Sequence, residues 1–400
     1  MAIGFSSPRS ASLALLPEMT FSAALPPAIR GGTCRALATL APSVLRSAAA
    51  SGLGLRASAD ALTRSRARAA TPVKLTLPWI ANGSNYWPVV GKKLGYFSKR
   101  GIDVDVARGF GSVAAAQAVA NKQFEFGLVF AGGNILAAAR GLPIVVLASV
   151  VYDAMMGIAL RPDSPISIPK DLEGKRLGIV PTSAEAPFWP AFAQAAGVDA
   201  SKVSLVQVDA KVVERVLFDR QVDAITAIGS SSIPVMVALG ERPRFLLWSR
   251  YGVELYAGQI VTRPDVLDAN PDLCQSMVDA ILESYAHTLR EPERSIDEFV
   301  QEVPEIGLTK GGRENAQISQ GLAQLMTVRP EAMDHALGWT DPGKLPAMID
   351  LVMKYGVPAD AKRPDPEKLA TNKLVGRIVL TAPEWDQVKR NTAQYAGYLG

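Results

Sequence analysis

The sequence predicts an α/β protein made of two lobes with a ligand cleft between them. From residue 73 onward, segments with strand-like and helix-like patterns alternate, and a region of helices follows. The alternation falls into two units of about 90 residues each, which is the size of a small domain. Strand–helix–strand alternation at this spacing implies right-handed crossovers in mostly parallel sheets.

The first unit begins with a short strand in which apolar and polar residues alternate. Gly101 follows the first helix at the position where a left-handed conformation is common, and Ser112 is the expected N-cap of the second helix. Gly132 and Gly133 are expected to form a turn before the third helix. The expected strands are 73–77, 102–107, 126–130 and 143–151, and the expected helices are 85–100, 112–122 and 134–140.

The second unit repeats this style, and the character of the sequence changes after it. The expected strands are 176–180, 203–208, 222–228 and 244–248, and the expected helices are 187–196, 211–219 and 234–239. After a last apolar stretch at 256–262, residues 271–303 form a long amphipathic helical stretch that is broken near Pro292. Proline and charged residues gather between 358 and 368, as in a tail that wraps the surface.

Residues 1–70 differ from the rest in composition and are expected to be a leader without a packed core. They carry eight arginines, no lysine and two acidic residues, a net charge of +6, whereas residues 71–400 carry −2. An export signal, an organelle transit peptide and an upstream extension with Met19 as another start all fit this composition. No unbroken apolar stretch in the leader approaches the roughly 18 to 20 residues of a membrane span.

Composition also excludes several classes of function. The chain has only two cysteines, Cys34 and Cys274, so a disulfide framework and a CxxC zinc site are excluded. Its two histidines, His287 and His335, lie far apart, which disfavours a histidine-rich metal site. No basic run occurs outside the leader, so nucleic-acid binding is disfavoured. We expect no metal and no cofactor.

No catalytic constellation is recognisable in the sequence. The string at 229–232 is Gly-Ser-Ser-Ser, which is not a GxSxG nucleophile elbow, and no histidine lies in the two α/β units to act as its base. We therefore expect a binding protein with no catalytic residues.

Ligands in open α/β sheets bind outside the carboxyl ends of the strands, so the loops there hold the candidate contacts. In the first loop, Trp79 and Tyr86 could stack on a flat ring, while Asn82 and Asn85 could hydrogen-bond its heteroatoms. The alternative is that these aromatic side chains pack beneath the sheet.

Two further strand ends of the first unit offer small residues at helix N-termini. Backbone N–H groups there can bind a carboxylate, sulfonate or nitrate. The alternative is a tight turn in which Ser112 only caps its own helix. The candidates are Gly109, Phe110, Gly111 and Ser112 in one loop and Phe130, Ala131 and Gly132 in the next.

The second unit supplies hydroxyl groups and two more aromatic side chains. Thr182 and Ser183 follow a strand, and Phe188 and Trp189 lie in the helix that comes next. The two aromatic residues could complete a sandwich around a ring, although Trp189 could equally pack in the core of its lobe. Gly229 and Ser230 end another strand and offer a third hydroxyl-bearing loop.

A series of short strings, in the same order and spacing, resembles one family. The strings are GYF at 95–97, GIDV at 101–104, GFG at 109–111, QFEFG at 123–127, ARGLPI at 139–144, DLEGKRLG at 171–178 and QVDA at 221–224. Together they resemble the solute-binding proteins of ABC importers for nitrate, sulfonates, taurine and thiamine-precursor pyrimidines. The resemblance covers residues 73–262, and it departs from the pattern at Gln221, where a glycine is usual.

The resemblance implies a type II periplasmic-binding-protein fold whose chain crosses twice between the lobes, near 156–161 and 256–262. One lobe is then 73–157 with 260–400, and the other is 158–259. We therefore expect a periplasmic monomer that captures a small molecule and delivers it to an ABC permease in the inner membrane.

The aromatic first loop favours a planar heterocycle, such as a pyrimidine or an aromatic acid, as the ligand. A small sulfonate, taurine or nitrate is the alternative, but Arg108 is the only cationic residue in these loops. A pyrimidine-synthase-like enzyme on the same scaffold is a further alternative, although the cysteine cluster of that branch is absent here.

Overall fold

A computed structural model of the chain describes residues 70–181 and 183–399. The interpretations of the leader as signal, transit peptide or extension fall on residues outside this part. Within it, none of the helices combines the length and the apolar character that crossing a membrane requires.

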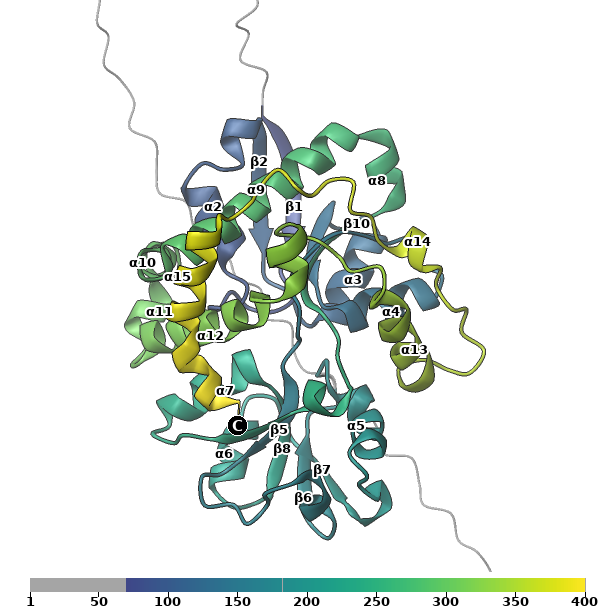
Figure 1. The fold of residues 1–400 in the computed structure, drawn as a ribbon, viewed down its shortest axis with the longest axis vertical. Coiled ribbons are helices and arrows are strands. Elements are labelled where there is room, and N and C mark those ends of the chain that lie inside the picture. Colours follow the sequence, from purple (N-terminus) through teal and green to yellow (C-terminus); the bar gives the residue numbers. More distant parts are fainter. Residues whose placement is uncertain (1–69, 182, 400) are drawn as a thin grey trace, which may run out of the picture. The chain divides into compact units, whose positions relative to one another are not determined.

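The first of two five-stranded sheets has the strand order β2-β1-β3-β10-β4 (Figure 1). Its strands are β1 (Thr71–Thr76), β2 (Ile102–Ala107), β3 (Phe126–Val129), β4 (Val145–Val151) and β10 (Ala257–Thr262). β1 runs parallel to β2 and β3, whereas β10 is inserted antiparallel between β3 and β4. We call this sheet and the helices packed on it the first lobe.

The second sheet has the order β7-β6-β8-β5-β9 and repeats this plan. Its strands are β5 (Met156–Leu160), β6 (Arg176–Ile179), β7 (Ser204–Gln207), β8 (Ala224–Ile228) and β9 (Arg244–Leu247). Here β5 is the antiparallel insertion, between β8 and β9. The two sheets are therefore topologically equivalent, and the two-lobed α/β fold predicted from the sequence is confirmed. We call the second sheet and its helices the second lobe.

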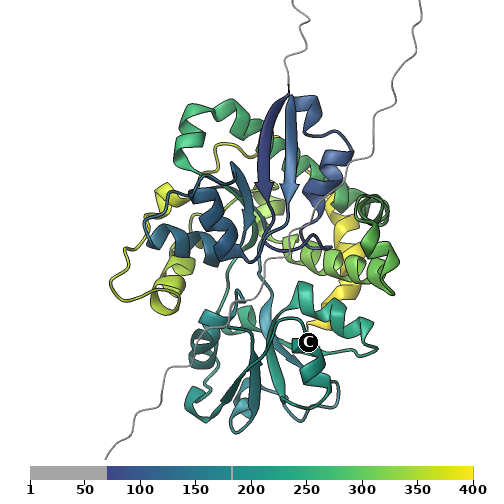
Figure 2. The same ribbon diagram turned by 180° about the vertical axis from the view of Figure 1, so that it is seen from behind.

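The chain passes between the sheets twice, and the views from the two sides show both passages (Figures 1 and 2). The first is residues 152–155, between β4 and β5, and the second ends at residue 256, just before β10. The expected crossings at 156–161 and 256–262 therefore correspond largely to strands. Their apolar residues pair on both edges, β5 with β8 and β9, and β10 with β3 and β4, which a free connection would not do.

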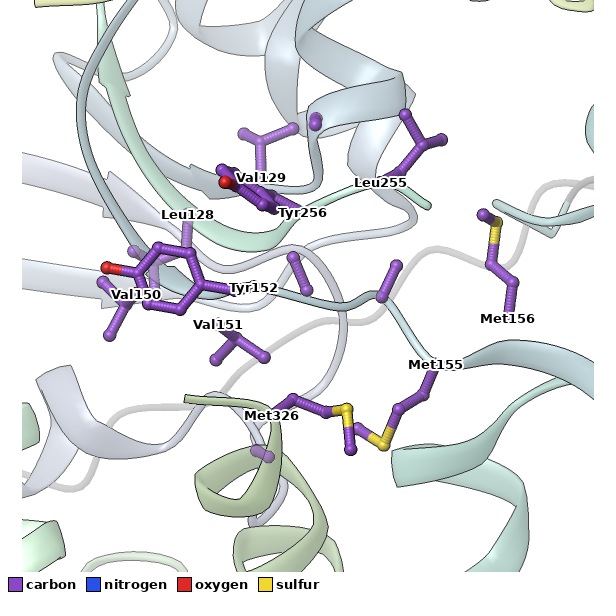
Figure 3. Close-up of a cluster of buried hydrophobic side chains, with 14 of the residues drawn as sticks. Leu128, Val129, Val150, Val151, Tyr152, Met155, Met156, Leu255, Tyr256 and Met326 are labelled. Atoms are coloured by element: carbon purple, nitrogen blue, oxygen red, sulfur yellow. The ribbon is translucent and has the colours of Figure 1, made fainter. Parts of the chain in front are cut away.

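The two crossing segments are joined to each other. The backbone N–H of Ala154 donates to the carbonyl of Leu255 across 2.8 Å. Met155 adopts a left-handed conformation, with φ of 49°, and its side chain extends toward Met326 of a C-terminal helix (Figure 3). Apolar side chains from both lobes thus pack around the crossings.

Helices follow the strands as the alternation predicts; α3 (Ser112–Ala120) starts at the expected residue, whereas the other starts differ. In the first lobe they are α2 (Trp87–Lys93), α3 (Ser112–Ala120) and α4 (Ala131–Ala139); in the second they are α5 (Trp189–Ala195), α6 (Val213–Phe218) and α7 (Gly229–Ala238). α2 is shorter than expected, and a separate turn, Ser98–Arg100, ends at Gly101 with φ of 70°. Gly132 and Gly133 lie inside α4, not in a turn before it.

A close approach of two helices explains the glycine at position 133. A Cβ there would lie 2.9 Å from the backbone of Ser112, at the start of α3. Gly133 thus lets α3 and α4 come together, and the small residues that suggest a turn in the sequence serve packing.

The C-terminal third is helical, as predicted, and proline lies in the first turn of each of its α-helices except α12 (Gly312–Thr327). The helices are α8 (Pro264–Ala269), α9 (Pro271–Arg290), α10 (Pro292–Glu302), α11 (Pro304–Leu308), α12 (Gly312–Thr327), α13 (Leu345–Tyr355), α14 (Pro366–Leu369) and α15 (Ala382–Thr392), followed by the 3₁₀ segment η7 (Ala393–Tyr398). Proline fits the first turn because its missing N–H has no helical acceptor there. The predicted break at Pro292 is confirmed. α9 packs on α2, α13 packs on α4, and α12 reaches α7 of the second lobe.

Candidate functional site

Loops from both lobes line two pockets. The small pocket, a cavity of about 40 Å³, is lined by both lobes and by the crossing segments. Its candidate residues are Ser112, Phe130, Gly132, Ser183 and Phe188. The large pocket, about 400 Å³, includes Trp79, Asn82, Lys211, Glu214 and Ser230.

The two lobes lie close together at the small pocket. A Cβ at Gly132 would lie 3.3 Å from the ring of Phe188, so a side chain in the first lobe would press on the second. Ser112 does not cap its own helix as expected, because Gly111 occupies the N-cap position with φ of 115°. The hydroxyl of Ser112 instead accepts a hydrogen bond from the backbone N–H of Phe130 across 3.2 Å, which connects two of the candidate loops. Ala131, next to Phe130, is fully buried at the start of α4.

In the first loop, the structure separates residues that the sequence groups together. Trp79 is 42 % exposed and lies with Asn82 in the lining of the large pocket. Asn85 is buried and holds the loop closed: its amide donates to the carbonyl of Ile80, and its side-chain oxygen accepts from the N–H of Asn82. Asn85 is thus part of the loop's internal scaffold.

Tyr86 belongs to the interior of the first lobe. Its hydroxyl lies 2.6 Å from that of Ser295 and also donates to Gln320, while its ring packs against Phe299 with centroids 4.7 Å apart. Desolvation by burial raises the pKa of Tyr86. Tyr86 therefore packs in the interior, against α10 and α12.

Two of the backbone N–H groups expected to bind an anion are engaged within the first lobe. The N–H of Gly109 donates to the carbonyl of Trp79, and that of Gly111 donates to the carbonyl of Pro78. A Cβ at Gly109 would lie 1.9 Å from a backbone carbonyl oxygen, so glycine is required where these two loops meet. Phe110 is 71 % exposed, and the Arg108 guanidinium lies over its ring at 4.6 Å.

The second-lobe candidates also divide. Ser183 and Phe188 line the small pocket, and Ser230 lines the large one. Trp189 is 2 % exposed and packs against Phe192, so it lies in the core of the lobe. The backbone N–H of Gly229 donates to the carbonyl of Met155 at the crossing. Thr182 lies outside the described residues.

Two carboxyl groups in this region, Glu185 and the half-buried Glu214, are not among the residues predicted from the sequence. Glu185 is buried, and its Oε1 accepts from the hydroxyls of Ser183 at 2.6 Å and Thr226 at 3.2 Å. Its Oε2 is also buried and has no hydrogen-bond partner among the described residues. Burial raises the pKa of Glu185, and burial likewise raises the pKa of Glu214 in the large pocket.

The sequence carried only a partial signal for Glu185. The residue follows Thr182 and Ser183 at the end of a strand, where side chains of the binding loop are expected. One of its hydrogen-bond donors, however, is Thr226 of β8, a strand about forty positions later in the chain. In the described part of the chain, no cluster of histidine, cysteine and acidic residues could hold a metal ion.

Two equivalent α/β lobes, joined by two crossing segments and lined by strand-end loops, define the fold of periplasmic solute-binding proteins. The alkanesulfonate-binding protein SsuA from Xanthomonas axonopodis pv. citri, bound to MOPS, has this fold, with a TM-score of 0.54 and 15 % identity, over 78 % of this chain and 97 % of SsuA. The nitrate-binding protein NrtA from Synechocystis PCC 6803 matches with a TM-score of 0.55 and 15 % identity, over 82 % of this chain and 91 % of NrtA.

The chain belongs to the NMT1/THI5-like family, whose sequence profile matches residues 86–295. Among curated proteins, the formylaminopyrimidine-binding protein of Halalkalibacterium halodurans is 23 % identical over 242 residues, which is 60 % of this chain and 73 % of that protein. The family resemblance inferred from the short strings is therefore confirmed.

Proposed function

We propose that the protein is the extracytoplasmic solute-binding subunit of an ABC importer and that it captures a planar nitrogen heterocycle of the pyrimidine type. Family membership and the two-lobed fold support the general function. The name of the curated relative, a formylaminopyrimidine-binding protein, supports the ligand class. The expected lobes, 73–157 with 260–400 and 158–259, shift by a few residues so that β5 belongs wholly to the second lobe and β10 to the first. Closure of the cleft between the lobes captures the ligand without chemical change.

The choice of ligand rests on the side chain of Glu185. Its Oε2 is a buried acceptor without a partner among the described residues, and an unpartnered buried polar atom costs free energy unless something binds it. An amino group on a heteroaromatic ring donates N–H groups in the ring plane and would supply that partner. The flanking residues Ser183 and Ala184 line the small pocket, which would widen to admit such a ring.

The remaining contacts follow from the pockets. Trp79 would cover one face of the ring, and the hydroxyls of Ser183 and Ser230 and the amide of Asn82 would hydrogen-bond its substituents. The proposed ligand contacts are Trp79, Asn82, Ser112, Phe130, Ala131, Gly132, Ser183, Phe188 and Ser230, with Glu185 and Glu214 added.

The same observations weigh against a small anion. The backbone N–H groups of Gly109 and Gly111 are used within the first lobe, and two carboxyl groups lie in the region of the cleft. Carboxyl groups supply no positive charge to balance a sulfonate or nitrate.

Binding to the full-length protein tests this proposal. We expect aminopyrimidines to raise the melting temperature in a thermal-shift screen, and taurine, nitrate and aromatic acids to leave it unchanged. Glu185→Gln should weaken binding of the best ligand at least about tenfold, because one of the two acceptor oxygens becomes a donor. Glu173→Gln, which changes a carboxylate paired with Lys170 elsewhere on the second lobe, is the matched control and should not alter affinity.

Two results would overturn the proposal. Stabilisation by taurine or nitrate alone would assign the cleft to anions. Linear formation of a product from the bound heterocycle, followed by mass spectrometry over many turnovers, would show an enzyme on this scaffold.

The same proposal places the protein outside the cytoplasm, as a monomer that docks on a membrane permease. N-terminal sequencing of the protein recovered from its native cell tests export. A processed N-terminus near residue 70 supports it, whereas an intact Met1 or Met19 on cytosolic material contradicts it.

A further inference from the structure

The last segment of the described chain bridges the two lobes. η7 (Ala393–Tyr398) follows α15, which runs from the level of the first sheet toward the second lobe in both views (Figures 1 and 2). Tyr395 contacts α12, and Tyr398 contacts Arg242 of the second lobe. The segment therefore touches both lobes without being one of the crossings.

The attachment to the first lobe is firm. Tyr395 lies so close to α12 that a Cβ at Gly321 would sit 2.1 Å from its ring. α15 is joined to α9 by the Arg290–Glu384 ion pair, with Nε and Oε1 2.6 Å apart. Glu384 also accepts from the N–H and hydroxyl of Thr381, which fixes the start of α15.

The attachment to the second lobe is a cation–π contact. The guanidinium carbon of Arg242 lies 5.1 Å from the centroid of the Tyr398 ring. A Cβ at Gly397 would lie 2.9 Å from a terminal nitrogen of Arg242, so glycine at this position leaves room for the guanidinium. The negative face of an aromatic ring attracts a cation in this position, and an aliphatic side chain does not.

A second contact joins the lobes at another position. Gln194 of α5, in the second lobe, accepts hydrogen bonds from Lys354 at 3.0 Å and from the hydroxyl of Tyr355, both at the end of α13. The next residue, Gly356, lines the small pocket. α13 packs on α4 of the first lobe, so this contact also connects the C-terminal helices to the second lobe.

We infer that the C-terminal helices act as a clamp in which two side-chain contacts, Tyr398–Arg242 and Tyr355/Lys354–Gln194, add to the packing of α12 on α7 and hold the lobes in the arrangement described here. The inference rests on the lobe closure in the proposed function, because a clamp matters only if the lobes can separate. A substitution that removes either side-chain contact shifts the equilibrium toward the open form, by a factor of ten in population for every 1.4 kcal/mol. The clamp thereby sets how much of the free protein is already closed.

Distance measurements between the lobes, without ligand, test the clamp. Spin labels at Asp103→Cys on β2 and Ser204→Cys on β7, both exposed edge-strand positions, report lobe separation by double electron–electron resonance. Cys34→Ser removes one of the two native cysteines, and the other, Cys274, is buried. We expect Tyr398→Leu and Gln194→Ala each to broaden the distribution of distances toward longer values. The double variant, which lacks both contacts, should broaden it further. Tyr398→Phe, which keeps the aromatic face, should leave it unchanged.

The readout does not require a ligand, so it separates failure of the clamp from failure of the ligand assignment. Arg242→Gln removes the same stacking pair from the other side, and combined with Tyr398→Leu it should add no further broadening. If the folded single variants give the distance distribution of the unmodified protein, the clamp is refuted.

Discussion

Tyr152 and Tyr256 meet at the point where the chain passes between its lobes. Their ring centroids are 5.2 Å apart with an interplanar angle of 87°, an edge-to-face contact between the first crossing and the second (Figure 3). The hydroxyl of Tyr256 donates to Oε1 of Glu331 across 2.7 Å, and Lys344 lies 2.7 Å from the same oxygen. The hinge is thus held by one aromatic contact and one charge-assisted network.

Tyr256→Phe should destabilise the protein while leaving the aromatic contact in place. The substitution removes a hydrogen bond to an ionised, buried carboxylate, for which about 1.5–3 kcal/mol is typical. Urea denaturation measures the decrease in stability. Tyr256→Leu, which also removes the ring, should cost more, and equal decreases for the two variants would contradict the importance of the ring contact.

Glu185→Gln should change how stability depends on pH. Burial raises the pKa of Glu185 above its ordinary 4.5, so the folded state holds the proton to higher pH than the unfolded state does. The free energy of unfolding of the unmodified protein therefore falls as pH rises from 4.5 through the folded pKa. Measured by urea titration, the stability of Glu185→Gln relative to the unmodified protein should rise over that window, and a difference independent of pH would contradict this.

Glu384→Gln should have the opposite pH dependence. Arg290, with the N–H and hydroxyl of Thr381, lowers the pKa of Glu384 to about 2, so the carboxylate stabilises the fold above pH 4.5 and the effect disappears as pH falls toward 2. We expect a decrease of about 0.5–1 kcal/mol at pH 7, typical of a capping-box side chain near solvent. Urea titrations between pH 3 and 7 measure it, with exposed Glu241→Gln as the unaffected control. A decrease that persists undiminished at pH 3 would contradict the ionic origin.

Lys122→Gly should stabilise the protein. Lys122 has φ of 63° just after α3, where a side chain strains the backbone and glycine does not. A gain of about 0.5–1 kcal/mol is expected, reduced by removal of the exposed ion pair with Asp265. Lys122→Ala removes the ion pair but keeps the Cβ, so calorimetry should show no gain for it. A gain in both variants would mean that backbone strain is not the cause.

Tyr86→Phe and Trp79→Ala should separate scaffold from binding site. Tyr86→Phe removes the hydrogen bonds of the hydroxyl with Ser295 and Gln320, which remain bonded to each other, and should cost about 0.5–1.5 kcal/mol of stability with little change in ligand affinity. Trp79→Ala should do the reverse, because Trp79 is exposed at the large pocket. Parallel denaturation and calorimetric binding measurements check both variants. Weakened binding by folded Tyr86→Phe would show that Tyr86 belongs to the binding site.

Local patterns were reliable where burial and turn chemistry acted within a short segment. β2 has the predicted bounds, and the helix break at Pro292 follows from proline's missing N–H. The strand β5 was expected as a connection, because nothing in its sequence shows that β8 and β9 flank it. The candidate site was likewise only partly predictable: Trp79 and Ser183 reach the pockets, whereas Tyr86 is used in the interior.

The sequence by itself determined the α/β class, the two repeated units and the family, because periodicity, turn residues and short motifs are properties of contiguous chain. Tertiary structure decided which polar groups remain available. Among the described residues, Thr226 and Ser183 both bind one oxygen of Glu185 and leave the other unpartnered, and the N–H groups of Gly109 and Gly111 donate to a loop about thirty positions earlier. Hydrogen-bond partners distant in sequence are chosen by packing, and no local pattern contains that choice.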